Sequence, residues 1–131
     1  MEFVMATQIS GKTSTQHSLI ASDRVEGTDV RRSGGDRIGT IQRLMIDKLS
    51  GKVAYAVIRY GGFLGMGEKH FPIPWASLQY RPALEAYEVA GSEAELGGAP
   101  SYASDAEFDW GDREGERALH DYYKVPPYWG I

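Results

Sequence analysis

The stretch Lys52-Val53-Ala54-Tyr55-Ala56-Val57-Ile58-Arg59-Tyr60 decides the fold class. It is rich in the β-branched and aromatic residues that strands favour. In a strand, Val53, Tyr55 and Val57 would point one way, and the equally apolar residues between them would point the other way. A strand that is apolar on both faces is expected to be covered on both faces. The stretch therefore predicts the central strand of a small β-sheet protein.

Glycine turns divide the neighbouring sequence into further short strands. Ser33-Gly34-Gly35-Asp36 and Lys48-Leu49-Ser50-Gly51 are turns of the kind that joins hairpin strands. The residue spacing in 37–47 fits a strand or a helix, but Gly39 and the close turns favour a strand. The strands expected are 28–32, 37–47, 52–60, 69–74, 79–81 and 86–89. This pattern predicts an all-β barrel or sandwich of about six strands.

Two prolines and a tryptophan mark the end of one strand. Pro72 and Pro74 lack the amide donor that a sheet needs on both sides, which predicts an edge strand or a bulge. Trp75-Ala76-Ser77-Leu78 is expected to form a tight turn or a short helical piece. Trp75 has two interpretations: a core side chain that plugs the barrel, which is favoured, or a recognition platform.

Composition and charge narrow the function classes. The chain has 131 residues and no cysteine, which excludes a disulfide scaffold, a thiol nucleophile and a cysteine-based metal site. Residues 19–96 hold ten basic and ten acidic residues, whereas residues 101–131 hold three basic and seven acidic ones. No basic stripe follows the chain, so direct nucleic-acid binding is not expected.

The ends of the chain differ from its centre. Residues 1–18 are polar and aperiodic and are expected to form a disordered leader without a secretory signal. Residues 19–100 form the expected barrel domain, and residues 101–131 an acidic, aromatic extension. No stretch has the roughly 20 apolar residues that a membrane-spanning helix requires. We expect a cytoplasmic protein without membrane insertion.

The extension carries the strongest signal for an interaction. It holds seven of the fifteen aromatic residues, whereas disordered tails are poor in aromatics. A short helix is expected over 112–123, followed by Val125-Pro126-Pro127. Its spacing places Leu119, Tyr122 and Tyr123 on one face. The aromatic residues that flank the helix are Trp110, Tyr128 and Trp129. The extension is expected to dock on a second protomer, on another protein or on its own barrel.

The glycine-rich segment 61–70 is the second candidate contact. Its glycine spacing matches neither a P-loop nor a dinucleotide fingerprint. Phe63, Leu64 and Met66 are expected either to meet a partner or to fold back over one end of the barrel. The candidate contact also includes Glu68, Lys69 and His70.

No residue pattern points to chemistry. Glu68 and His70 share a strand face, but no nucleophile or electrophile accompanies them, so ion pairing is the favoured interpretation. His17, His70 and His120 follow no metal-ligand spacing. We therefore expect neither catalytic residues nor a metal or cofactor site.

Residues 19–102 resemble the PRC-barrel family over about two-thirds of the chain. The resemblance rests on LIASDRV (19–25), IGTI (38–41), MIDKLSGKVAYAV (45–57) and GGFLGMGEKHFPIPW (61–75). The tail DYYKVPPYW (121–129) looks like extensions found on some stand-alone bacterial members. The resemblance implies a six-stranded barrel that has no chemistry of its own.

The family includes the cytoplasmic domain of the reaction-centre H subunit and the C-terminal domain of a ribosome-maturation factor. Three functions follow as expectations. The first is a non-enzymatic protein-interaction module that forms a homodimer. The second is an assembly or maturation factor for a ribosomal or photosynthetic complex, which rests on family analogy alone. The third is a barrel that binds a small ligand or a metal, which is disfavoured because small barrels fill their interiors with side chains.

Overall fold

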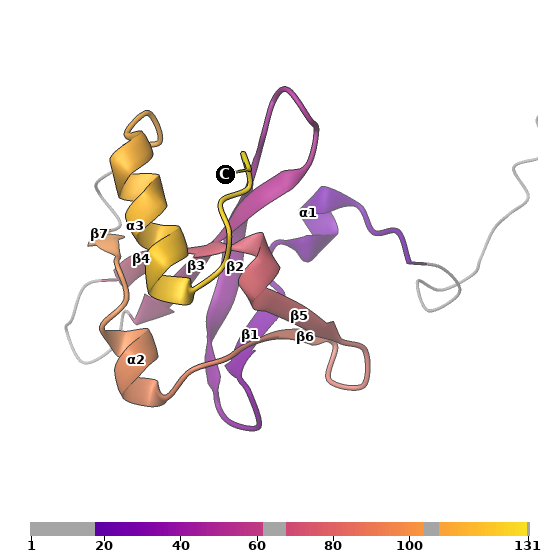
Figure 1. The fold of residues 1–131 in the computed structure, drawn as a ribbon. Helices are drawn as coiled ribbons and strands as arrows, with labels where there is room; N and C mark the ends of the chain where they lie inside the picture. The colour runs from indigo at the N-terminus through magenta and orange to yellow at the C-terminus, as the bar shows by residue number, and fades with distance from the viewer. Residues whose placement is uncertain (1–17, 62–67, 104–107, 131) are drawn as a thin grey trace, which may run out of the picture.

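The computed structural model describes residues 18–61, 68–103 and 108–130, and their fold is predominantly β-sheet (Figure 1). The strands are β1 (Asp29–Arg32), β2 (Arg37–Ile46), β3 (Val53–Gly61), β4 (Glu68–Pro74), β5 (Leu78–Arg81), β6 (Ala86–Val89) and β7 (Tyr102–Ala103). The helices are α1 (Ser22–Val25), α2 (Glu93–Gly97) and α3 (Arg113–Tyr123), with a 3-10 turn η3 at Trp75–Ser77. The six predicted strands agree with β1–β6 within a residue or two.

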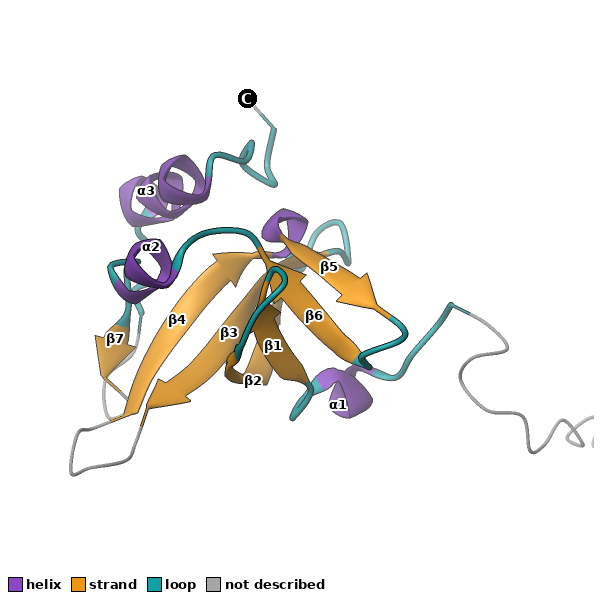
Figure 2. Ribbon diagram, turned by 90° about the horizontal axis from the view of Figure 1, so that it is seen from below, coloured by secondary structure: helices purple, strands orange, loops and turns teal. Residues whose placement is uncertain are grey.

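The seven strands of the described residues belong to one sheet in the order β5-β6-β1-β2-β3-β4-β7. Neighbouring strands are antiparallel, except that β1 runs parallel to β6. The fold is thus the expected all-β class with a C-terminal helix. The sheet is open, whereas a closed barrel was predicted: within the described residues no pairing joins β5 to β4 or β7. The 3-10 turn η3 connects the end of β4 to the start of β5 in this curved sheet (Figure 2).

The short strand β7 is the seventh and was not expected. Within the described residues it pairs with β4 at Lys69 and His70 alone, so β4 is an edge strand at its proline end. This position of Pro72 and Pro74 confirms the edge placement that their missing amide donors predicted.

The β2–β3 hairpin is held by local geometry. Gly51 has a φ of +78°, which favours glycine, and its amide donates to the Asp47 carbonyl over 2.8 Å. The Asp47 carboxylate accepts hydrogen bonds from the Ser50 amide and hydroxyl over 3.2 and 2.6 Å. The predicted turn is confirmed, and Leu49 lies at its exposed tip.

The core confirms the two-sided burial that decided the fold class, because residues 54–58 of β3 are all buried. The main cluster lies within the curve of the sheet and contains Val25, Val30, Ile41, Ala56, Ile58, Phe71, Ile73, Tyr87, Val89 and Ala99. Trp75 is half-buried against this cluster, with its ring 5.4 Å from that of Tyr87. A second cluster joins Ala54 and Tyr55 to Leu119 of α3.

The helices follow recognisable end signals. Ser92 and Glu95 form a capping box at α2, with Ser92 Oγ accepting from the Glu95 amide over 3.1 Å. Asp112 caps α3, which ends at Lys124 in the left-handed conformation. Among the described residues, no helix has the length and apolarity needed to span a membrane.

Candidate functional site

Helix α3 lies beside β4, and the chain after it turns back toward β3 (Figure 1). The helix is placed by its own apolar face, since Leu119 is fully buried in the second cluster. Trp110, just before the helix, packs its ring 5.3 Å from Tyr55, and Tyr128, just after it, packs its ring 5.6 Å from Tyr55. Tyr55 therefore lies at the centre of the contact between the extension and the sheet.

A buried polar cluster lies in this contact. The Tyr55 hydroxyl donates a hydrogen bond to Oε1 of Glu116 over 2.8 Å, and Nε2 of His120 lies 2.9 Å from the same hydroxyl. Glu116 is 4% exposed and His120 is 2% exposed. Because the Tyr55 hydrogen is directed at the carboxylate, the Tyr55 oxygen is free to accept the Nε2 hydrogen of His120. One hydroxyl thus joins two buried helix side chains to the central strand.

Burial sets the protonation of this cluster. Burial lowers the pKa of His120 below its usual value, although the Pro126 carbonyl and the Glu116 carboxylate act in the opposite direction. Burial, and then the Glu116 carboxylate, raise the pKa of Tyr55 far above its usual value. His120 is therefore neutral at neutral pH, and Tyr55 keeps its hydroxyl hydrogen.

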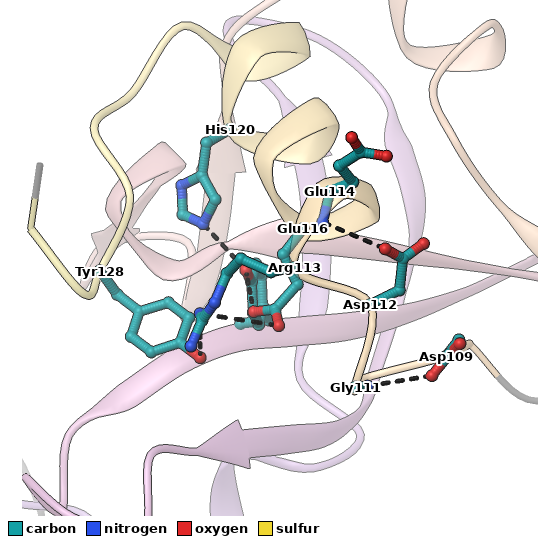
Figure 3. Close-up of polar contacts among 9 residues, drawn as sticks. Asp109, Gly111, Asp112, Arg113, Glu114, Glu116, His120 and Tyr128 are labelled. Atoms are coloured by element: carbon teal, nitrogen blue, oxygen red, sulfur yellow. Dashed lines mark hydrogen bonds and ion pairs between the residues drawn. The ribbon is translucent and has the colours of Figure 1, made fainter.

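Arg113 covers the outer side of the cluster (Figure 3). Its Nη1 lies 3.7 Å from Oε2 of Glu116 and donates to the Tyr128 hydroxyl over 3.3 Å. Its guanidinium also lies over the Trp129 ring, 3.9 Å from the ring centre. The guanidinium provides the charge that a buried carboxylate requires and holds the last aromatic residues against the helix.

An open hollow of about 610 Å³ lies beside the cluster. Its walls come from the β2–β3 hairpin, from the centre of β3 and from the extension. The lining residues are Met45, Ile46, Asp47, Lys48, Leu49, Ala54, Tyr55, Trp110, Glu116 and Tyr128. Ile46, Leu49 and Tyr128 are exposed at its edge, and Leu49 is 95% exposed. We refer to these three side chains as the apolar rim.

The structure brings together most of the extension residues that the sequence singled out. Trp110, Leu119 and Tyr128 meet around Tyr55, and Trp129 packs on Arg113 and on His120. Tyr123 packs against the main core cluster, whereas the exposed Tyr122 donates from its hydroxyl to the Glu95 carbonyl of α2. The extension therefore docks on its own chain, which is one of the alternatives that its pattern left open.

The glycine-rich segment is described only at its end. Phe63, Leu64 and Met66 lie outside the described residues. Glu68 begins β4, Lys69 is exposed, and His70 is buried with its ring 5.2 Å from that of Tyr102. Within residues 18–61, 68–103 and 108–130, no group of three His, Cys, Asp or Glu side chains could hold a metal ion.

The polar cluster of Tyr55, Glu116 and His120 was not predicted from the sequence. Glu116 and His120 are four residues apart, and Leu119 lies beside them on the same side of the helix. That spacing was the available signal, because a helix that buries Leu119 also buries its neighbours at positions 116 and 120. Their partner, Tyr55, lies more than sixty positions earlier in the chain, where the alternating pattern indicated only burial.

The comparisons with known proteins agree with this architecture. The family model for the PRC-barrel domain matches residues 18–96, which include α1, all strands from β1 to β6 and most of α2. No curated protein matches the chain. The match covers more than half of the sequence and includes the segments that carried the resemblance; the chain belongs to the PRC-barrel family.

Proposed function

We propose that this protein is a non-enzymatic protein-interaction module whose partner binds the apolar rim and the hollow beside it. The observation that carries the proposal is the exposure of Leu49, which is 95% exposed at the tip of a well-formed turn. Large apolar side chains gathered at one edge of a hollow are typical of interaction sites.

The hairpin presents Leu49 on a supported backbone. The hydrogen bonds from Ser50 to the Asp47 carboxylate and from Gly51 to the Asp47 carbonyl fix the turn. The bonds from Ser50 also lower the pKa of Asp47 and so keep its carboxylate ionised. A side chain held in this way loses little conformational freedom on binding, which favours affinity.

The aromatic walls of the hollow form the second part of the proposed binding site, next to the exposed Leu49. The rings of Trp110 and Tyr128 pack against the buried Tyr55 ring, with ring centres 5.3 and 5.6 Å from it. Trp110 is partly exposed and Tyr128 is exposed, so these two rings are available to a partner side chain. Tyr and Trp are the residues most often found as energetic anchors of interfaces. The extension thus contributes Trp110, Glu116 and Tyr128 to the proposed site by docking on its own sheet.

The polar cluster supports a binding role better than a catalytic one. The Tyr55 hydroxyl bonds both to the Glu116 carboxylate and to Nε2 of His120, and Arg113 covers the carboxylate. Buried polar groups linked in this way fix the position of the elements that carry them. In the proposal, the cluster holds the extension in place so that the rim and the hollow keep their shape.

We further propose that the protein acts as a homodimer in the cytoplasm. Leu49 projects beside the hollow it helps to line, so two copies related by a two-fold axis could each bury the other's rim. A cysteine-free chain fits a reducing compartment. The contact predicted for Phe63, Leu64 and Met66 remains part of the proposal as a second surface.

The proposal is tested by affinity capture from native lysate with surface variants of the full chain. Leu49→Ser removes the most exposed rim residue, and Leu84→Ser is the matched control, because Leu84 is an exposed leucine at the distant β5–β6 turn. A Phe63/Leu64/Met66 triple alanine variant tests the second surface. Light scattering after size-exclusion chromatography gives the mass of each variant.

The expected result is a partner, or a dimer, that the wild type and Leu84→Ser retain and Leu49→Ser loses. Loss in the triple variant alone would move the contact to the glycine-rich segment and refute the rim as the site. Equal retention by all variants, or equal loss in Leu49→Ser and Leu84→Ser, would contradict both surfaces.

A further inference from the structure

A cavity of about 140 Å³ enters the main core cluster at one end of the sheet. Its inner walls are the side chains of Ile38, Ile58, Phe71, Ile73 and Leu96. Ile58 and Ile73 are 1% exposed, and both belong to the main cluster. The sequence predicted a barrel interior filled by side chains, and at this end the described residues leave it partly unfilled.

The size of the cavity sets the size of the group it accepts. Apolar cavities of about 150 Å³ take up one benzene molecule. An apolar body of about six carbon atoms therefore fits among the isoleucines and Phe71. A concave apolar cavity with a few polar groups at its entrance is the usual form of a small-molecule site.

The mouth of the cavity is formed by polar side chains from the β1–β2 turn. Arg32, Asp36 and Arg37 line it, together with Tyr60 from β3. Arg37 is held through its Nε, which lies 2.9 Å from a carboxylate oxygen of Asp29. Arg32 has the looser ion pair, with Nη2 lying 3.6 Å from Oδ2 of Asp36, whose side chain is 86% exposed.

The backbone of the turn positions the Arg32 guanidinium. A Cβ placed on Gly35 would lie 3.1 Å from Cζ and Nη2 of Arg32, so the guanidinium lies directly over this glycine. Exposed ion pairs as long as that of Arg32 and Asp36 contribute little. The guanidinium can therefore exchange Asp36 for a better-placed carboxylate, to which it can donate two parallel hydrogen bonds.

From this geometry we infer a binding site for a small apolar monocarboxylate, whose hydrocarbon body enters the cavity and whose carboxylate binds Arg32 at the mouth. Benzoate and hexanoate have the required size and charge. The residues that line this cavity, Arg32 included, are different from those that line the hollow beside Tyr55. The site is therefore independent of the proposed protein interaction.

The site is tested by titrating the full chain, labelled at its isoleucine methyl groups, and following the Ile58 and Ile73 signals by NMR. The probes are sodium benzoate and sodium hexanoate. Benzyl alcohol serves as the apolar control without charge, and sodium acetate as the charged control without an apolar body. Charge-assisted hydrogen bonds predict that benzoate binds at least about tenfold more tightly than benzyl alcohol.

Three variants test whether the Arg32 guanidinium is the positive charge that binds the carboxylate. Arg32→Gln should weaken benzoate binding about tenfold or more, and Gly35→Ala should weaken it while keeping the charge, because the new methyl group displaces the guanidinium. Arg43→Gln, which changes an exposed arginine of β2 outside the cavity lining, should bind like the wild type. Unchanged thermal unfolding would show that each variant is folded.

The inference is overturned if benzoate leaves the Ile58 and Ile73 methyl signals unmoved. Equal affinity for benzoate and benzyl alcohol would also refute it, because the carboxylate would then play no part. Binding that Arg32→Gln leaves intact, or that Arg43→Gln weakens equally, would contradict the role of Arg32.

Discussion

Replacing Tyr55 with phenylalanine isolates the polar contact that fastens α3 to the sheet. The change removes one hydroxyl and keeps the ring that packs between Trp110 and Tyr128. The lost bonds are those of 2.8 Å to Glu116 and 2.9 Å to His120, both buried. A buried group left without its partner costs about 1–3 kcal/mol, and two such groups are left. Allowing for rearrangement around Arg113, we expect the free energy of unfolding to fall by about 2–4 kcal/mol.

The measurement is urea unfolding of both proteins, followed by tryptophan fluorescence and by circular dichroism. Tyr80→Phe is the matched control, because Tyr80 is exposed on β5 and its change should cost less than about 0.5 kcal/mol. A Tyr55→Phe variant as stable as the wild type would refute the idea that this cluster holds the extension. So would a cost equal to that of Tyr80→Phe.

Three further predictions follow from the same contacts. His120→Gln should flatten the pH dependence of stability. The pKa of His120 is lowered in the folded protein, so its contribution to stability is complete above the usual value of 6.5 and is lost as the pH falls below that value. Urea midpoints from pH 8 to 5 check this, and parallel curves for the variant and the wild type would contradict it. Gly39→Ala should lower the free energy of unfolding by about 2 kcal/mol or more, because the new Cβ would overlap the Arg59 carbonyl oxygen. In the control Gly97→Ala the new Cβ meets no atom within 4 Å, so that change should be near neutral or stabilising. Equal thermal midpoints for the two variants would contradict the close packing of β2 on β3 at Gly39. Leu119→Ala should cost about 2–5 kcal/mol by urea unfolding, against little for Leu84→Ala, and a small loss at Leu119 would mean that α3 does not depend on this anchor.

The local signals in the sequence were sufficient for the strands and turns. The strand at 52–60 was recognisable because both its faces are apolar, and the helix at 112–123 because acidic residues begin it and Pro126 and Pro127 follow it. Pro72 and Pro74 indicated an edge strand or a bulge because each lacks the amide donor that a central strand needs. In each case the residue types themselves restrict the backbone.

The features that were missed depend on contacts between distant segments. Strand β7 has only two residues, too few for a periodic pattern, and it forms because β4 offers an edge at Lys69 and His70. Glu116 and His120 resemble solvent-facing residues, and their burial depends on the distant Tyr55 hydroxyl and, for Glu116, on Arg113. The cavity beside Ile58 arises from strand curvature and from the position of α2, which the spacing of apolar residues does not determine.

The docked extension also changes how the protein should be dissected. A chain that stops after residue 100 would lose Leu119 and Glu116 and would uncover Tyr55 and Ala54. Loss of a partner in such a truncation would not distinguish a missing contact from a disturbed sheet. Single surface substitutions at the rim keep the core intact and therefore test the contact more specifically than a truncation does.

The most direct test of the proposed interaction is site-specific photo-crosslinking in living cells. A photoreactive phenylalanine analogue is placed at Leu49 in one variant and at Leu84 in another, both exposed leucines. We predict a discrete covalent adduct, either with one partner protein or with a second copy of the chain, from position 49 and not from position 84. Adducts from position 84 alone, equal adducts from both positions or none from position 49 would contradict the claim that the rim around Leu49 is the surface through which this protein binds.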